Sequence, residues 1–97
     1  MASSLAAVRG AEEAGATHVP NAALHVKLAQ EELQQAKQLM EDDKNLRAED
    51  KAMRAEQDAE LALLLTRRSA AAKKLAEFTA ANASAGGVTP AAPAVGP

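Results

Sequence analysis

The stretch NLRAEDKAMRAEQDAELALLLTRRS, residues 45–69, decides the fold of this chain. Within it, small residues recur every three or four positions: Asn45, Ala48, Ala52, Ala55, Ala59, Ala62, Thr66 and Ser69. This spacing places them on one side of an α-helix, as in the seam of a coiled coil. Because the seam is almost entirely alanine, we expect a second helix to pack closely against it.

The expected partner is a helix over residues 22–42. Its apolar side chains have the same spacing: Ala22, Val26, Ala29, Leu33, Ala36 and Met40. The acidic connection at residues 41–45 is short, which favours an antiparallel hairpin. In that arrangement larger residues face alanines, with Leu33 near Ala55 and Val26 near Ala62. The Ala29–Ala59 pair brings the helix axes close to the lower end of about 8–10 Å.

A short N-terminal helix completes the predicted fold, and the helix ends are set by capping residues. Ser4 is an expected N-cap for a short helix over residues 4–14, which Gly15 ends. After Pro20, Asn21 is expected to cap the helix over residues 22–42, and Asp43 or Asn45 to cap a third helix over residues 46–82. We therefore predict an all-α domain at residues 1–82, an antiparallel coiled-coil helical hairpin with a short N-terminal helix. The Ala/Gly/Pro-rich residues 83–97 are predicted to be a disordered tail.

Composition excludes several functional classes. The chain has 97 residues, a net charge of −2 and no cysteine. Acidic and basic residues alternate, unlike the basic footprint of a nucleic-acid-binding protein, so no nucleic acid is expected as a partner. The absence of cysteine excludes disulfides and thiol chemistry. No apolar run is long enough to span a bilayer, so membrane attachment is expected only through a lipid anchor on an exported form, with the export signal absent here.

One apolar stretch does not fit a two-helix hairpin. In LALLL, residues 61–65, two leucines turn away from the seam, and further apolar and basic residues follow on the same helix. A second apolar face requires a second partner, and either the N-terminal helix or a second subunit would supply one. The expected interaction surface consists of Leu61, Leu65, Arg67, Arg68, Ala72 and Leu75.

No catalytic, cofactor-binding or metal site is expected, so we predict that the protein is not an enzyme. His25 and Glu32 share one side of their helix and would form a metal or proton site if a residue of the third helix joined them. We favour the simpler interpretation, in which His25 is hydrogen-bonded or half exposed near Thr66. A thin, alanine-based hairpin also has little volume for a buried pocket.

The chain resembles a known bacterial family. The segments PNAALHVKLAQEELQQAK (residues 20–37), MEDDKNLRAE (residues 40–49) and AEQDAELA (residues 55–62) resemble the bacterial domain of unknown function 4398. The resemblance covers about residues 10–72, with Val26 in place of the family's first leucine. It implies small exported proteins of Gram-negative bacteria, often lipoproteins of the periplasm or outer membrane, that are candidate antigens. It implies no catalytic residues.

These observations lead to one main functional hypothesis and two alternatives. The main hypothesis is a non-enzymatic interaction or scaffold module of the bacterial envelope, whose partner is an unknown protein or cell-envelope component. The expected oligomeric state is a monomer or a weak homodimer. The first alternative is a structural homo-oligomer paired through Leu61, Leu65, Ala72 and Leu75. The second is binding to an anionic surface through the basic patch at residues 67–74.

Overall fold

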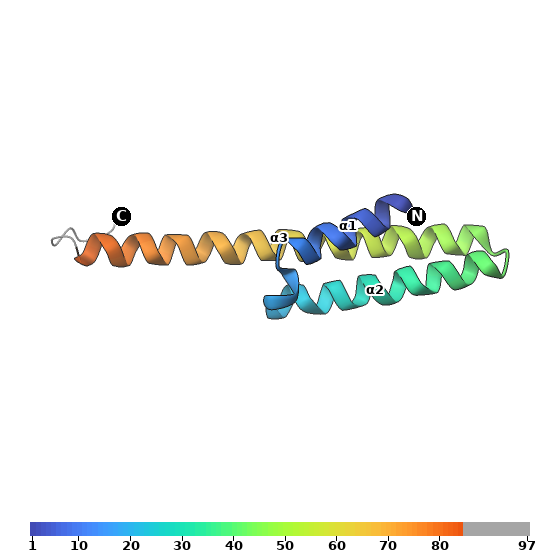
Figure 1. The fold of residues 1–97 in the computed structure, drawn as a ribbon, viewed down its shortest axis with the longest axis horizontal. Coiled ribbons are helices and arrows are strands. Elements are labelled where there is room, and N and C mark those ends of the chain that lie inside the picture. Colours follow the sequence, from blue (N-terminus) through green and yellow to red (C-terminus); the bar gives the residue numbers. More distant parts are fainter. Residues whose placement is uncertain (85–97) are drawn as a thin grey trace, which may run out of the picture. The chain divides into compact units, whose positions relative to one another are not determined.

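The computed structural model describes residues 1–84 and confirms the all-α prediction (Figure 1). Its elements are α1 (Ala2–Glu13), a 3₁₀ turn η1 (Ala16–His18), α2 (Pro20–Glu41) and α3 (Asn45–Ser84). The chain forms two units, Met1–Arg67 and Arg68–Pro97, and the second is described as far as residue 84. Most of the predicted tail, from residue 85 onward, lies outside the described residues.

In the first unit, α1, α2 and the N-terminal part of α3 lie side by side, with α2 and α3 antiparallel (Figure 1). One core cluster joins Ala29 and Leu33 of α2 to Ala55 and Ala59 of α3. A second cluster contains Val26 and Ala62. Both clusters match the register expected for the hairpin. The alanine seam is therefore internal, with Ala55 and Ala62 fully buried.

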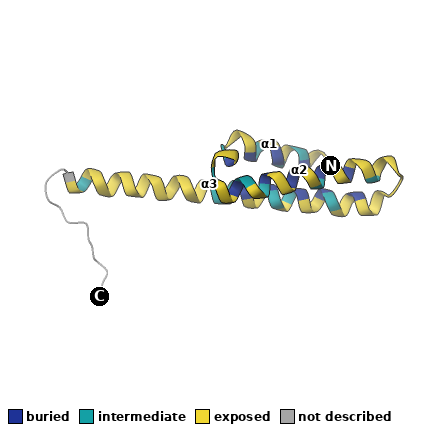
Figure 2. Cartoon of the chain, turned by 90° about the horizontal axis from the view of Figure 1, so that it is seen from below, coloured by how far each residue is buried: buried dark blue, intermediate teal, exposed yellow. Residues whose placement is uncertain are grey.

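Helix α1 covers one side of this hairpin. Val8 belongs to the cluster of Ala29 and Ala59, and Ala11 belongs to the cluster of Val26 and Ala62. Ser4 is 2 % exposed, and its hydroxyl donates a 2.9 Å hydrogen bond to the Ala52 carbonyl oxygen of α3. The prediction of Ser4 as an N-cap is therefore wrong: α1 begins at Ala2, and Ser4 is an internal residue that ties α1 to α3. Figure 2 shows the buried residues gathered where these three helices face one another.

The connection from α1 to α2 depends on Gly15 and Pro20. Gly15 has φ 92°, in the left-handed region, and its N–H donates to the Glu12 carbonyl oxygen, as expected for a residue that ends a helix. Helix α2 then begins at Pro20, with Val19 as its N-cap. The expected cap at Asn21 is wrong because the fixed φ of proline favours Pro20 as the first helical residue.

The turn between α2 and α3 is a Schellman motif. Asp43 has φ 60°, its N–H donates to the Met40 carbonyl oxygen, and the Lys44 N–H donates to the Leu39 carbonyl oxygen. Asp43 therefore ends α2 and does not cap α3. Asn45 is already the first residue of α3, and the Ala48 N–H donates to the Lys44 carbonyl oxygen, so the predicted caps at Asp43 and Asn45 are both wrong.

Candidate functional site

The residues of the expected interaction surface that belong to the first unit differ in exposure. Leu61 is 39 % exposed and Arg67 is exposed. Leu65, however, is half-buried and packs against the cluster that contains Ala11 and Val26. The end of α1 and the turn after it therefore cover the Leu65 side chain. Leu61 and Arg67 are the residues of the expected surface in the first unit that remain accessible.

The remaining members belong to the second unit and are all exposed. Arg68 and Ala72 are exposed, and Leu75 is 65 % exposed. Sequence reasoning missed Phe78, which is 63 % exposed and is the only aromatic residue of the chain. Its spacing of three residues from Leu75 was the signal that would have identified it. Two large apolar side chains are thus exposed to solvent on one helical segment.

A second candidate site crosses the α2–α3 interface in the first unit. His25 Nδ1 of α2 lies 3.2 Å from Asp58 Oδ1 of α3. The Glu32 carboxyl group, two turns along α2 from His25, also interacts with Asp58. The structure therefore supplies the third-helix residue that the sequence interpretation did not find. His25 does not pair with Thr66, whose hydroxyl donates instead to the Ala62 carbonyl oxygen at 2.8 Å.

The position of Glu32 favours its protonated form. Desolvation by burial and the facing Asp58 carboxyl raise the pKa of Glu32 from 4.5 to about 7, although Lys51 and Arg54 oppose this change. The Glu32 Oε1 atom is buried and makes no hydrogen bond among the described residues. A protonated Glu32 donates a hydrogen bond to Asp58, whereas two ionised carboxylates repel each other. With its pKa raised to about 7, Glu32 carries a proton between the two helices at pH values below about 7.

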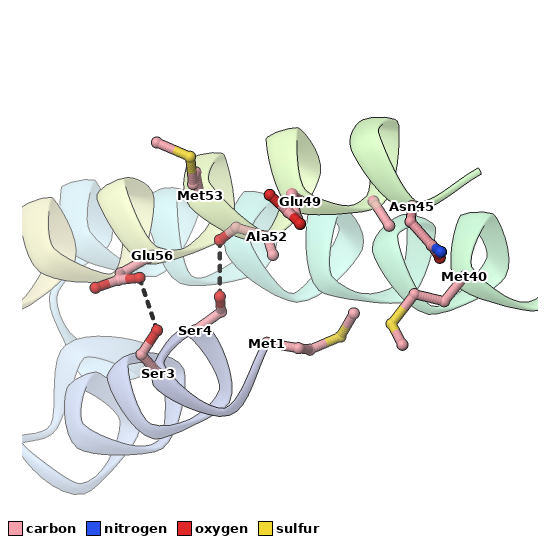
Figure 3. Close-up of a pocket in the computed structure, with 10 residues that line it drawn as sticks. Met1, Ser3, Ser4, Met40, Asn45, Glu49, Ala52, Met53 and Glu56 are labelled. Carbon is pink, nitrogen blue, oxygen red and sulfur yellow. Dashed lines mark hydrogen bonds between the residues drawn. The ribbon is translucent and has the colours of Figure 1, made fainter. Parts of the chain in front are cut away.

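A third feature is a cavity of about 480 Å³ between the start of α1 and the α2–α3 turn (Figure 3). All three methionines of the chain line it, together with Asn45, Glu49 and Glu56. The Ser3 hydroxyl donates to Glu56 Oε1 at 3.1 Å, and Ser4 donates into α3. Both hydroxyl groups thus anchor α1. Met40 is 49 % exposed here, so it lies at the edge of the seam and is not buried in it as expected.

Residues 1–84 contain no group of three or more His, Asp or Glu side chains arranged to hold a metal ion. The helices within the same range lack the combination of length and apolarity that crossing a membrane requires.

Comparison with known proteins yields one informative match. A family model described as a domain of unknown function (DUF4398) matches residues 1–78. No curated protein and no solved structure matches the chain. The matched range includes all of α1 and α2, and it includes α3 as far as Phe78.

Proposed function

This chain belongs to the family described as a domain of unknown function (DUF4398), and we propose that it is a non-enzymatic interaction module of the bacterial envelope. In this proposal residues 1–67 are a supporting bundle and the exposed face of residues 68–84 contacts the partner. The envelope location, in the periplasm or at the outer membrane of a Gram-negative bacterium, is supported by the resemblance of the chain to exported lipoproteins.

The single observation that carries the proposal is the exposure of Leu75 and Phe78, at 65 % and 63 %. Residues 68–84 are the C-terminal part of the continuous helix α3, and most helical stability in proteins comes from packing an apolar face. The side chains of residues 67–81 are all exposed, so this segment gains little from packing. A partner that covers Leu75 and Phe78 would supply the missing contacts.

Site-specific photo-crosslinking in cells tests this proposal. A photoreactive amino acid at position 75 or 78 should give adducts, whereas the same amino acid at position 73, on the opposite side of the helix, should give few. Adducts of equal yield at positions 73 and 75 would contradict a one-sided interaction surface. Fractionation of the same cells should place the protein in the envelope, and recovery only in the cytosol would contradict the proposed location.

The homo-oligomer is the competing proposal, and the packing of Leu65 weakens it. Because Leu65 packs within its own chain, it contributes little to pairing between chains. Sedimentation analysis separates the two proposals. A monomer at high micromolar concentration is expected, whereas a stable dimer that Leu75→Ser dissociates would favour the homo-oligomer.

A further inference from the structure

The two large exposed apolar residues of the second unit, Leu75 and Phe78, share one face of its helix with Ala71. At about 100° per residue, Ala71, Leu75 and Phe78 fall within about 60° of one another around the helix axis. All three are exposed, Leu75 and Phe78 at 65 % and 63 %. We call these three residues the apolar face.

Charged residues are arranged around this face in a definite order. Arg68 and Lys74 lie about 50–70° from its centre, on opposite sides. Lys73 and Glu77 lie about 130–170° away, on the far side of the helix, where their spacing of four residues allows them to pair. The segment from 68 to 84 has three basic residues and one acidic residue. Its apolar face is therefore bordered by cations, and its only acidic group points away.

We propose that residues 68–82 bind the surface of an anionic lipid bilayer, with the apolar face toward the acyl chains and Arg68 and Lys74 on the lipid phosphates. This inference rests on the proposed function and names the partner of that surface. Long basic side chains that border an apolar strip extend their charges to headgroup level while their methylene groups cover apolar surface. The helix lies in the interface and does not cross the membrane, in keeping with the hydropathy of the described helices.

The same charge pattern disfavours a second copy of the chain as the partner. Two such faces in contact would bring Arg68 and Lys74 of one copy against the like charges of the other. Glu77, the only acid of the segment, would lie outside the contact and could not compensate. An anionic bilayer provides phosphate groups on both sides of the apolar face.

The apolar face is small, so electrostatics must contribute much of the affinity. Each Lys or Arg near an anionic surface raises the partition coefficient about fivefold, and this contribution falls off within a Debye length. Removing Lys74 should therefore weaken binding about fivefold. Lys73 faces away from the surface, so removing it should have a clearly smaller effect. Because these neighbours carry the same charge, they form a matched pair.

The test is vesicle binding by the full chain carrying Phe78→Trp. The sequence contains no tryptophan and no tyrosine, so this substitution gives a single fluorescent reporter. Vesicles of phosphatidylcholine and phosphatidylglycerol at 7:3 should shift its emission to shorter wavelength in low salt, and 500 mM NaCl should reverse the shift. Pure phosphatidylcholine vesicles should cause little change. Lys74→Gln should lower the partition coefficient about fivefold and Lys73→Gln less than twofold.

Several outcomes would overturn the inference. No emission shift with anionic vesicles at low salt would exclude bilayer binding, and equal effects of Lys74→Gln and Lys73→Gln would show attraction by net charge alone. If vesicles fail but crosslinks at positions 75 and 78 join the chain to an acidic protein, the bilayer inference is wrong and the proposed function stands. If crosslinks at these positions are also absent, both fail.

Discussion

Replacing Glu32 with glutamine should make the stability of the bundle less dependent on pH. The pKa of this carboxyl is raised from 4.5 to about 7, first by desolvation and then by Asp58. The folded chain therefore binds a proton more tightly than the unfolded chain does between these values. The stabilisation from that proton is fully present below pH 4.5 and is lost as the pH rises through about 7.

The size of the effect follows from the difference in pKa. A change from 4.5 to about 7 corresponds to at most about 3 kcal/mol, and solvent screening at this half-buried site reduces it to about 1 kcal/mol. For a domain of this size, about 1 kcal/mol changes Tm by about 4–8 °C. Glu32→Gln keeps a donor toward Asp58 at every pH, so the variant should melt about 5 °C above the wild type at pH 8 and near it at pH 5.5.

Thermal unfolding followed by circular dichroism between pH 5.5 and 8 provides the assay. Other groups face this site, namely Asp58, Lys51 and Arg54 of α3, with His25 of α2 on Asp58. They are present in both proteins, so the difference between wild type and variant reports on the change at position 32. Glu31→Gln is the matched control, because Glu31 is the exposed neighbour on the same helix. Parallel Tm curves for wild type and Glu32→Gln, or equal shifts for Glu31→Gln, would refute the reasoning.

Four further substitutions test the packing and the turns, each by chemical or thermal denaturation. Ala59→Leu should destabilise the bundle by about 1–3 kcal/mol, because Ala59 is 1 % exposed between α2 and α3; a higher Tm would contradict the close seam. Gly10→Ala should stabilise α1 by about 0.5–1 kcal/mol, because an added Cβ at position 10 meets no atom within 4 Å. Gly15→Ala should lower the stability by about 1–2 kcal/mol, because residue 15 has φ 92°. Equal effects at these two glycines would argue against the α1 boundary. Asp43→Gly should stabilise the α2–α3 turn by up to about 1 kcal/mol, because glycine adopts φ 60° without strain, and a loss of stability would show that the Asp43 side chain contributes more than its backbone costs.

The hairpin could be predicted from the sequence because the apolar residues of its two helices recur at regular spacing. The matching spacing of Leu33 and Val26 with Ala55 and Ala62 determines both the buried faces and the register once the short turn sets the direction. A rotation of either helix by one residue, about 100°, would expose its apolar residues. Apolar periodicity and the short turn therefore sufficed for the hairpin and for the internal position of the alanine seam, but they left open where α1 docks.

The individual polar contacts could not be predicted in the same way. Serine is a favoured N-cap residue, yet the role of Ser4 depends on its hydrogen bond to the Ala52 carbonyl oxygen, 48 residues away. Asp58 contacts His25 because the orientation of α3 about its own axis brings this side chain toward α2. The apolar spacing does not determine that orientation to within one residue. Local rules also favoured Asn21 over Pro20 as the helix start, because they weighed side-chain capping above the fixed φ of proline.

The exposure of the candidate interaction residues was partly predictable from the sequence. Leu75 and Arg68 were identified because they did not fit the seam, and both are exposed. Leu65 was grouped with them because its direction on the helix is similar, but the docking of α1 and η1 near Val26 covers it. Phe78 was missed because it follows the last leucine of the helix and lies outside the leucine-rich stretch.

Hydrogen exchange of the free protein, resolved along the chain, tests the central claim most directly. We predict slow exchange for the backbone amides of residues 26–62, which the three-helix packing protects, and fast exchange for residues 71–82, whose apolar face is exposed. Exchange in residues 71–82 as slow as in residues 26–62, in dilute monomeric protein, would contradict the account, because this segment would then be stabilised without a partner.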